Sequence, residues 1–391
     1  MASILFLIGK YPNYGGTEKV TTILANEFVN NGHSVVIASF EQTVPSLKDE
    51  LNSDIQLVNL TYPTLSRGNK EKLKSVINSL KIDFIINQWA LPFQTNLLCR
   101  RAIGKSNCKI ISVYHNAPDK NARVTDIDIK LSSLKTKGWK YMLLHSKRAI
   151  INTIIRFSVQ YVYNHSDRYV ILSDSFKKIF SDYAGVKDLH KLVVITNPLT
   201  INTEAIDMSQ KEKLIVYVGR IDYNQKRVER IIEIWKAIEK ELSGWKLEIV
   251  GDGPERQKLE EIVDEQNIEK ISFEGYQDPY EYYKRASVLL LTSEYEGFGL
   301  VIVEGMSLGV VPVVYGSYEA VYDIIENEKT GFVTQKPYRQ TDFELIIKQI
   351  TSNDAVREEM AVKCMVESNK FTLQEISKKW NQLFDNLLEN S

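Results

Sequence analysis

Apolar positions along residues 1–200 follow two alternating patterns. Short continuous runs rich in Val, Ile and Leu predict buried strands, which we place at residues 3–8, 35–40, 54–60, 83–87, 109–113, 169–172 and 192–196. Between them, helical spacing of apolar residues predicts helices at 17–30, 70–80 and 93–103, and Thr17 could cap the first. Strands that alternate with helices are typical of a doubly wound parallel sheet.

The same alternation restarts after residues 199–213, a polar stretch without apolar periodicity that we interpret as a linker. Beyond it, strands are expected at 214–218, 246–250 and 288–291, and another ends at residue 276. The predicted fold is therefore α/β, with two tandem doubly wound, Rossmann-like domains at residues 1–200 and 210–370.

Residues 288–314 combine a strand, a loop, a helix and a second strand, and they carry two glutamates. Glu296 lies in the loop, and Glu304 lies one to two turns into the helix. Ligands bind at this edge of an open α/β sheet. Both carboxylates are therefore candidates to bind hydroxyl groups. Alternatively, both are solvated, and Glu296 only complements the positive end of the helix.

The loop between these glutamates suits an anion, because glycine allows close backbone approach and the first amides of a helix are unpaired. The free N–H groups belong to Gly299, Leu300 and Val301. A carboxylate beside such a site would repel phosphate, so we expect the glutamates to face hydroxyls. Sugars supply hydroxyls, and nucleotides supply phosphates.

Three cations precede the helix that begins near Val228: Arg220, Lys226 and Arg227. Positive side chains are unfavourable at a helix N-terminus, which is itself partly positive. A bound diphosphate would explain them, and exposure to water is the alternative. Gly219 ends the preceding strand, and a second glycine turn, with Gly251 and Gly253, opens a helix at the same edge.

The first domain offers weaker candidates. Its first loop contains Gly15 and Gly16 but lacks the three-glycine dinucleotide fingerprint, which argues against a nicotinamide enzyme. The two glycines allow a phosphate or a sugar to approach, or they serve only a tight turn. His115 follows a strand at its carboxyl end, where ligands bind, although a lone histidine is more often structural.

Residues 129–166 contain no Asp or Glu, while Lys and Arg recur among apolar and aromatic residues. This pattern is typical of a basic amphipathic segment at an anionic membrane surface, or of a helix face solvated by lysine. Just upstream, Asp126 and Asp128 match the two-aspartate pattern of metal-dependent glycosyl transfer. They lie outside any clear strand end, so we interpret the match as chance.

Composition excludes few classes of protein. The net charge of −1 gives no general attraction to nucleic acid. Three unpatterned cysteines indicate reduced thiols. No apolar run reaches 18 residues, and the N-terminus leads directly into a strand, so we expect a cytoplasmic protein, either free or peripheral on the inner face of the plasma membrane.

The order of these motifs resembles the retaining glycosyltransferases of the GT-B fold, specifically the large bacterial family four. The matching residues are Gly219-Arg220 with Lys226, GDGPE at 251–255, EGFGLVIVE at 296–304, Gly309 and Pro312. The first domain matches loosely, through Gly15-Gly16, His115 and Asn197-Pro198. The resemblance implies a cleft between the two domains, an acceptor-binding first domain, and a C-terminal helix at 372–391 that packs back on it.

The resemblance also implies roles for residues of the second domain. Arg220 and Lys226 would hold the donor diphosphate and replace a metal ion, so neither a metal nor another cofactor is expected. Glu296 would bind hydroxyls of the donor sugar, and Glu304 would bind the ribose hydroxyls. The amides from Phe298 to Leu300 would lie near the sugar and the phosphate.

In the first domain, His115 would lie near the primary hydroxyl of the donor sugar or near the reacting centre. Gly15 and Gly16 would leave room for the diphosphate and the acceptor. Three positions depart from the family pattern: Arg227 and Gly305 replace a common glycine and alanine, and Gly316-Ser317 replaces a common Gly-Gly.

The implied reaction moves a hexose or N-acetylhexosamine, with retention, from a nucleotide-diphosphate sugar to a glycan or polyprenyl-linked glycan. UDP is the favoured nucleotide, and bacterial surface polysaccharide is the expected product. Two alternatives stay open: a noncatalytic subunit that binds nucleotide sugar or glycan for a partner enzyme, and a nucleotide-sugar epimerase of the same fold.

Overall fold

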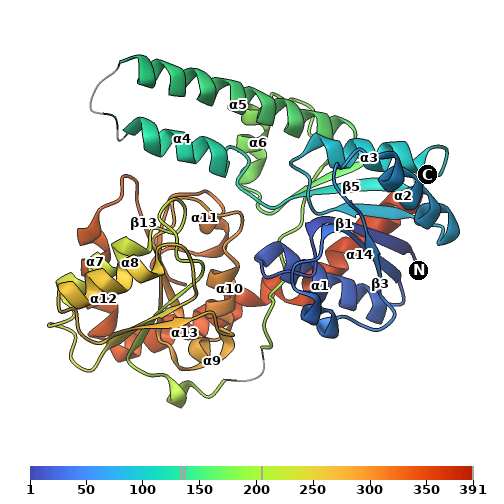
Figure 1. Ribbon diagram of the computed structural model, residues 1–391. Helices are drawn as coiled ribbons and strands as arrows, with labels where there is room; N and C mark the ends of the chain where they lie inside the picture. Colours follow the sequence, from blue (N-terminus) through green and yellow to red (C-terminus); the bar gives the residue numbers. More distant parts are fainter. Residues whose placement is uncertain (133, 135–137, 204–205, 390–391) are drawn as a thin grey trace. The chain divides into compact units, whose positions relative to one another are not determined.

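The computed structural model describes residues 1–132, 134, 138–203 and 206–389. The chain forms two compact α/β units (Figure 1). Unit 1 comprises Met1–Thr200 and Thr372–Ser391, and unit 2 comprises Ile201–Phe371. The described residues contain no helix that is both long and apolar enough to cross a membrane.

Unit 1 is built on a parallel sheet with the strand order β3-β2-β1-β4-β5-β6-β7. Its strands are β1 (Ser3–Lys10), β2 (Ser34–Glu41), β3 (Gln56–Asn59), β4 (Phe84–Asn87), β5 (Lys109–Tyr114), β6 (Arg168–Ile171) and β7 (Leu192–Val194). The central strands are buried on both faces, which is why they read as unbroken apolar runs in the sequence.

The helices of unit 1 are α1 (Gly16–Asn30), α2 (Arg67–Ser79), α3 (Phe93–Ile103), α4 (Ala122–Ser132), α5 (Trp139–Asn164), α6 (Phe176–Ala184) and the C-terminal α14 (Leu373–Glu389). The predicted cap at Thr17 is wrong, because α1 begins one residue earlier and its N-cap is Gly15. Helix α14 packs on this unit: the ring of Phe384 stacks on Phe84 at 4.8 Å and meets Phe28 edge-on at 5.4 Å.

Unit 2 is built on a second parallel sheet, with the order β10-β9-β8-β11-β12-β13. Its strands are β8 (Leu214–Val218), β9 (Lys246–Val250), β10 (Ile271–Gly275), β11 (Val288–Leu291), β12 (Val311–Tyr315) and β13 (Phe332–Thr334). Its helices are α7 (Val228–Ile238), α8 (Arg256–Glu265), α9 (Tyr280–Arg285), α10 (Leu300–Ser307), α11 (Val321–Ile324), α12 (Gln340–Thr351) and α13 (Asp354–Ser368).

The two sheets share a topological feature that locates candidate sites. In unit 1 the strand order reverses between β1 and β4, and in unit 2 it reverses between β8 and β11. Loops that leave adjacent strands on opposite sides of such a point diverge, and they open a crevice at the carboxyl edge of the sheet. The predicted fold class, two tandem doubly wound domains, is confirmed.

Candidate active site

The centre of the candidate site in unit 2 is an ion pair across the reversal of strand order. Lys226 lies in the loop after β8, and Glu296 lies in the loop after β11. Lys226 Nζ donates to Glu296 Oε1 at 2.7 Å, and the two side chains are only 15% and 9% exposed. The resemblance assigns Lys226 to the diphosphate and Glu296 to the sugar of one donor molecule. The structure brings the two side chains into direct contact.

Arg220 is positioned by a carboxylate that the sequence analysis did not single out. Its guanidinium donates to Asp222 Oδ2, with Nε at 2.7 Å. The other oxygen of Asp222 accepts from the backbone amides of Gln225 and Lys226 at 2.7 and 3.3 Å. Asp222 therefore shapes the whole loop, while 64% of the Arg220 side chain stays exposed to a ligand. Its only sequence signal is an Asp two residues after an Arg in a loop.

Arg227 also has carboxylate partners within the chain. Its guanidinium pairs with Glu229 at 2.5 Å and with Glu294 at 3.2 Å. Its backbone is left-handed, with φ 55° and ψ 45°. That conformation favours glycine, which explains why a glycine is common at this position of the family pattern. The sequence predicts a bound diphosphate, or water, as the partner of these three cations, and the structure shows that each also has a carboxylate partner within the chain.

The glycine turns after β8 and β9 are packed against each other. A Cβ added at Gly251 would lie 1.9 Å from the carbonyl oxygen of Gly219, and one at Gly253 would lie 2.2 Å from that of Ile221. The amide of Ile221 donates to the Asp252 carbonyl at 2.9 Å. The close packing of the two loops is therefore sufficient reason for glycine at positions 251 and 253, with or without a bound ligand.

Helix α10 begins at the same edge of the sheet. Its N-cap, Gly299, has φ 95°, and a Cβ there would lie 2.7 Å from the Tyr318 hydroxyl. Leu300 and Val301 follow in the first turn, where N–H groups have no partner within the helix. The ring of Phe298 points into the core of unit 2, edge-on to Phe371 at 5.4 Å, so only its backbone can face a ligand.

Glu304, the fifth residue of α10, is buried, and its Oε2 accepts from the Tyr283 hydroxyl at 3.4 Å. Two buried hydroxyls near the carboxyl ends of β11 and β12, Ser293 Oγ and Tyr318 Oη, have no hydrogen-bond partner among the described residues. A buried hydroxyl without a hydrogen-bond partner lowers the stability of the fold. These two hydroxyls therefore indicate a site where polar groups of a ligand could bind.

The remaining predicted residues lie in unit 1. His115 follows β5, and its Nε2 lies 2.5 Å from Gln88 Oε1, at the end of β4. Burial lowers the pKa of His115 to about 4, so the imidazole is neutral near pH 7. Gly16 is the first residue of α1. Asn197 is buried, three residues beyond the end of β7.

The space beside Gly15 is already occupied. A Cβ at Gly15 would lie 2.2 Å from Glu18 Oε2, so the Glu18 carboxylate folds back over the N-terminus of α1. The predicted role of Gly15, to leave room for the diphosphate and the acceptor, stays a prediction. The Glu at the third position of the helix is the only sequence signal for the carboxylate beside Gly15.

Helices α4 and α5 form an antiparallel pair (Figure 1). The predicted basic segment, residues 129–166, covers the end of α4 and all of α5, although Lys135 and Lys137 lie outside the described residues. One stripe of α5 exposes at least 55% of each of six large apolar side chains: Trp139, Met142, Leu143, Ile150, Ile154 and Phe157. Asp126 and Asp128 lie within α4, and Asp128 pairs with Arg148, so these aspartates do not follow a strand.

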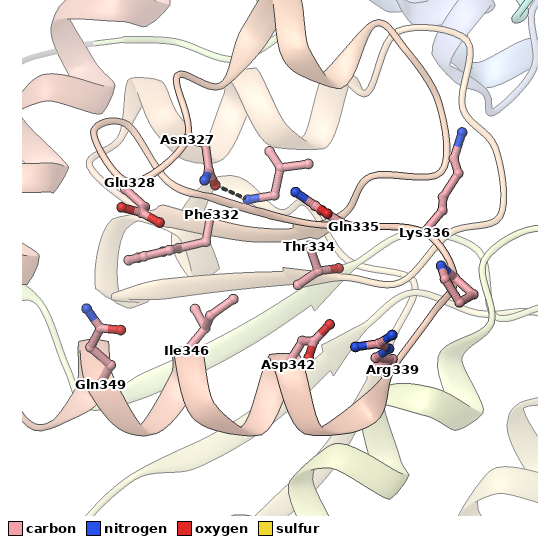
Figure 2. A pocket seen from close by; sticks show the side chains of 12 residues that line it. Asn327, Glu328, Phe332, Thr334, Gln335, Lys336, Arg339, Asp342, Ile346 and Gln349 are labelled. Carbon is pink, nitrogen blue, oxygen red and sulfur yellow. Dashed lines mark hydrogen bonds between the residues drawn. The ribbon is translucent and has the colours of Figure 1, made fainter.

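A hollow of about 380 Å³ lies between β13 and α12, and it contains none of the predicted residues (Figure 2). Asn327 borders it and accepts from the backbone amide of Val333 at 2.8 Å. The outer edge of β13 is thereby covered by a side chain. Figure 2 shows mixed charges along the wall, with Asp342 on α12, Arg339 at the N-cap of that helix and Lys336 in the preceding loop.

Sequence relatives cover nearly the whole chain. The amylovoran biosynthesis glycosyltransferase AmsD of Erwinia amylovora is 22% identical over 391 residues, which span 98% of this chain and 100% of the relative. A Campylobacter jejuni protein is 23% identical over 98% of both chains. It is named GalNAc-α-(1→4)-GalNAc-α-(1→3)-diNAcBac-PP-undecaprenol α-1,4-N-acetyl-D-galactosaminyltransferase.

Among solved structures, Anabaena HepE in complex with UDP-glucose superposes with a TM-score of 0.74 at 16% identity, over 100% of both chains. The sequence model for Glycosyltransferase Family 4 matches residues 14–202. The model for Glycosyl transferases group 1 matches residues 201–364. The two matches together take in every strand of the two sheets except β1, and they include Lys226 and Glu296. The chain therefore belongs to the family 4 glycosyltransferases, with the GT-B fold.

Proposed function

We propose that this glycosyltransferase moves a hexose or N-acetylhexosamine, with retention, from a nucleotide-diphosphate sugar to a glycan or lipid-linked acceptor of a bacterial surface polysaccharide. The observation that carries the proposal is the buried ion pair of Lys226 and Glu296 at the reversal of strand order in unit 2. A cation for phosphate and a carboxylate for hydroxyls stand side by side there, as a sugar linked to a diphosphate requires.

In this proposal the positive groups of unit 2 bind the diphosphate. The exposed guanidinium of Arg220 and the ammonium of Lys226 offset the charge that develops on the departing nucleotide. The first amides of α10, from Gly299 to Val301, add donors at a positive helix end. These groups do the work for which other transferases use a metal ion, so transfer is expected to continue in the presence of a chelator.

The carboxylates bind hydroxyls. Glu296, held by Lys226, accepts from ring hydroxyls of the donor sugar, and Glu304 accepts from the ribose hydroxyls. Ser293 Oγ and Tyr318 Oη are the unpaired hydroxyls nearest to these loops in sequence, and they are available to the sugar or the phosphate. The neutral His115 assists at the donor sugar or at the reacting centre.

The bond changes of the proposed reaction are simple. The bond between the anomeric carbon and the phosphate oxygen breaks, and a bond to the acceptor oxygen forms on the same face. The acceptor proton passes to the departing phosphate oxygen. No side chain of the chain serves as a covalent nucleophile in this proposal.

The names of the relatives support the nucleotide and the pathway class. HepE is described with UDP-glucose, the Erwinia relative is named for amylovoran biosynthesis, and the Campylobacter relative is named for a glycan on undecaprenyl diphosphate. A lipid-linked acceptor would also explain the exposed apolar stripe of α5, in a segment without acidic residues. We propose that this stripe contacts the anionic inner face of the plasma membrane.

Calorimetric titration with UDP, GDP and ADP tests the donor site. We expect one diphosphate to bind, with weaker binding to Glu304→Gln and unchanged binding to the control Glu358→Gln on the exposed side of α13. Absence of binding at millimolar concentration would remove the donor site and favour the noncatalytic subunit. Conversion of a UDP-hexose into its epimer, without a new glycoside, would favour the epimerase.

A further inference from the structure

Arg230 is a buried cation that the proposed reaction does not use. It is the third residue of α7, and its side chain is only 11% exposed. Its guanidinium lies 4.1 Å from the ring centre of Tyr338 and 5.5 Å from that of Tyr315. A planar guanidinium packs well on such rings, which come from the end of β12 and from the loop before α12. The rings therefore fix the direction in which Arg230 presents its N–H groups.

The polar partners of Arg230 lie in the loop after β11, which carries Glu296. Its Nη1 donates to the backbone carbonyl of Thr292 at 3.3 Å, and its Nη2 donates to Glu294 Oε1 at 2.5 Å. Arg227 Nη1 donates to the same carboxylate oxygen at 3.2 Å. Two arginines at the start of α7 thus hold this loop against the helix.

The loops after β8 and β11 are also joined through backbone groups. The amide of Glu294 donates to the carbonyl of Gln225 at 2.7 Å. The side-chain amide of Gln225 donates in return to the carbonyl of Tyr295 at 3.1 Å. Gln225 directly precedes Lys226, and Tyr295 directly precedes Glu296. These contacts therefore end at the two residues of the buried ion pair, and the position of the pair depends on how the loops are joined.

The groups assigned to the diphosphate have support of their own. Asp222 accepts from Arg220 and from the amide of Lys226, and the first amides of α10 belong to a separate helix. The loop of Glu296, by contrast, has two of its contacts with Arg230. A binding group has to be held within about 0.5 Å of its productive position. Loss of Arg230 should therefore disturb contact with the sugar more than contact with the diphosphate.

We propose that Arg230 is a positioning residue for the donor sugar. By holding the loop at Thr292 and Glu294, it keeps the next carboxylate, Glu296, where it can bind sugar hydroxyls. Arg230 itself touches neither the sugar nor the diphosphate in this role. The inference rests on the function proposed above, because that function supplies the contact between Glu296 and the sugar.

Calorimetric titration of the full chain tests this role. The probes are UDP, UDP-glucose, UDP-galactose and the N-acetylated forms of these two sugars. In Arg230→Met, we expect the Kd of the UDP-sugar that the wild type prefers to rise about tenfold, equivalent to about 1.4 kcal/mol. The Kd of UDP should stay within about twofold. An unchanged Kd for the UDP-sugar, or an equal rise for UDP, would overturn the role.

The chain offers a matched control, Arg357→Met. The Arg357 side chain is also 11% exposed, and its guanidinium lies 5.1 Å from the ring centre of Trp245. It donates to the Ile350 carbonyl at 3.1 Å and to Asp354 at 2.6 Å, on α12 and α13. Both variants should lose similar stability in urea, but Arg357→Met should bind the UDP-sugar as the wild type does. Equal loss of UDP-sugar affinity in both would indicate general loosening of unit 2 and would overturn the role.

A double-mutant cycle separates action through Glu296 from a direct effect. In the Glu296→Gln background, Arg230→Met should change the Kd of the UDP-sugar less than about twofold, because the group that it positions is already altered. A second loss of about tenfold would overturn the role. Arg230→Lys keeps the charge beside the rings but lacks the guanidinium fork, so its loss of affinity should be intermediate. It keeps the test valid if Arg230→Met does not fold.

The wild type separates failure of this inference from failure of the proposed function. If the wild type binds no UDP, the function proposed for unit 2 is contradicted. If it binds UDP but none of the UDP-sugars, the contact between Glu296 and the sugar is absent, and the positioning role is overturned.

Discussion

Lys226 and Glu296 come from loops 70 residues apart and meet at 2.7 Å where the strand order of unit 2 reverses. Each side chain is at least 85% buried, so each charge depends on the other for compensation. In the proposed function, the pair holds the cation for phosphate and the carboxylate for sugar hydroxyls in fixed positions before any donor arrives. Such preorganisation costs nothing further when charge develops in the transition state.

Replacing Lys226 should damage both stability and transfer. Lys226→Met leaves Glu296 buried without a counterion, which should cost about 3 kcal/mol in urea unfolding. It also removes a group that stabilises the leaving nucleotide, so the transfer rate should fall by about 10²–10³. The double variant with Glu296→Gln should recover most of the stability but none of the activity. Unchanged turnover in Lys226→Met would contradict the assigned role.

Arg227 allows backbone strain to be separated from ion pairing. Its left-handed conformation costs a non-glycine residue about 1 kcal/mol. Arg227→Ala loses the pairs with Glu229 and Glu294 and keeps this strain, whereas Arg227→Gly loses the same pairs and relieves it. Chemical denaturation should therefore find the glycine variant more stable than the alanine variant by about 1 kcal/mol. The reverse order would show that the loop does not require this conformation.

The sequence predicts every strand of the two sheets except the edge strand β13, and it predicts the edges at which sites form. Apolar runs such as residues 83–87 and 288–291 are buried on both faces of the sheet, and such continuous runs can be predicted as strands from the sequence. The sequence also shows which turns need glycine. It does not show why Gly15 is needed, because that depends on the position of the Glu18 side chain.

Charge partners could not be predicted. Asp222 stands only two residues from Arg220, but the sequence does not show that its carboxylate turns toward the guanidinium. Glu294 is 67 residues from Arg227, and the two meet because the sheet order brings their loops together. The contact between Gln88 and His115, which are 27 residues apart, has the same origin.

Two glycine substitutions should have opposite effects. At Gly251 a Cβ would lie 1.9 Å from a backbone oxygen, so Gly251→Ala must separate the two turns. We expect a loss of about 2–3 kcal/mol and weaker UDP binding. Gly68, in the first turn of α2, has nothing within 4 Å, and Gly68→Ala should be neutral or stabilising by about 0.5 kcal/mol. Thermal unfolding of both variants, with UDP titration, distinguishes the crowded glycine from the open one.

The exposed stripe of α5 should be needed for membrane contact. Leu143→Glu with Ile150→Glu places two charges in the stripe and should reduce flotation with anionic vesicles. A matched control, Val362→Glu with Val366→Glu, makes the same change on exposed positions of α13 and should float as the wild type does. Flotation that does not depend on anionic lipid, or an equal loss in both pairs, would count against the stripe.

His115 should make the stability of the protein depend on pH in acid. Burial lowers its pKa to about 4 in the folded chain, against about 6.5 when unfolded. Between these values the unfolded chain binds more protons, so the free energy of unfolding should rise with pH across this window and gain nothing from this group above it.

The comparison variant is His115→Asn, which cannot titrate. Its urea unfolding, measured from pH 4 to pH 7, should show a shallower pH slope than the wild type. The difference should be at most one proton, or about 1.4 kcal/mol per pH unit. Circular dichroism at pH 7 serves as the control for folding. Equal slopes would mean that the imidazole is accessible to water and that burial does not lower its pKa.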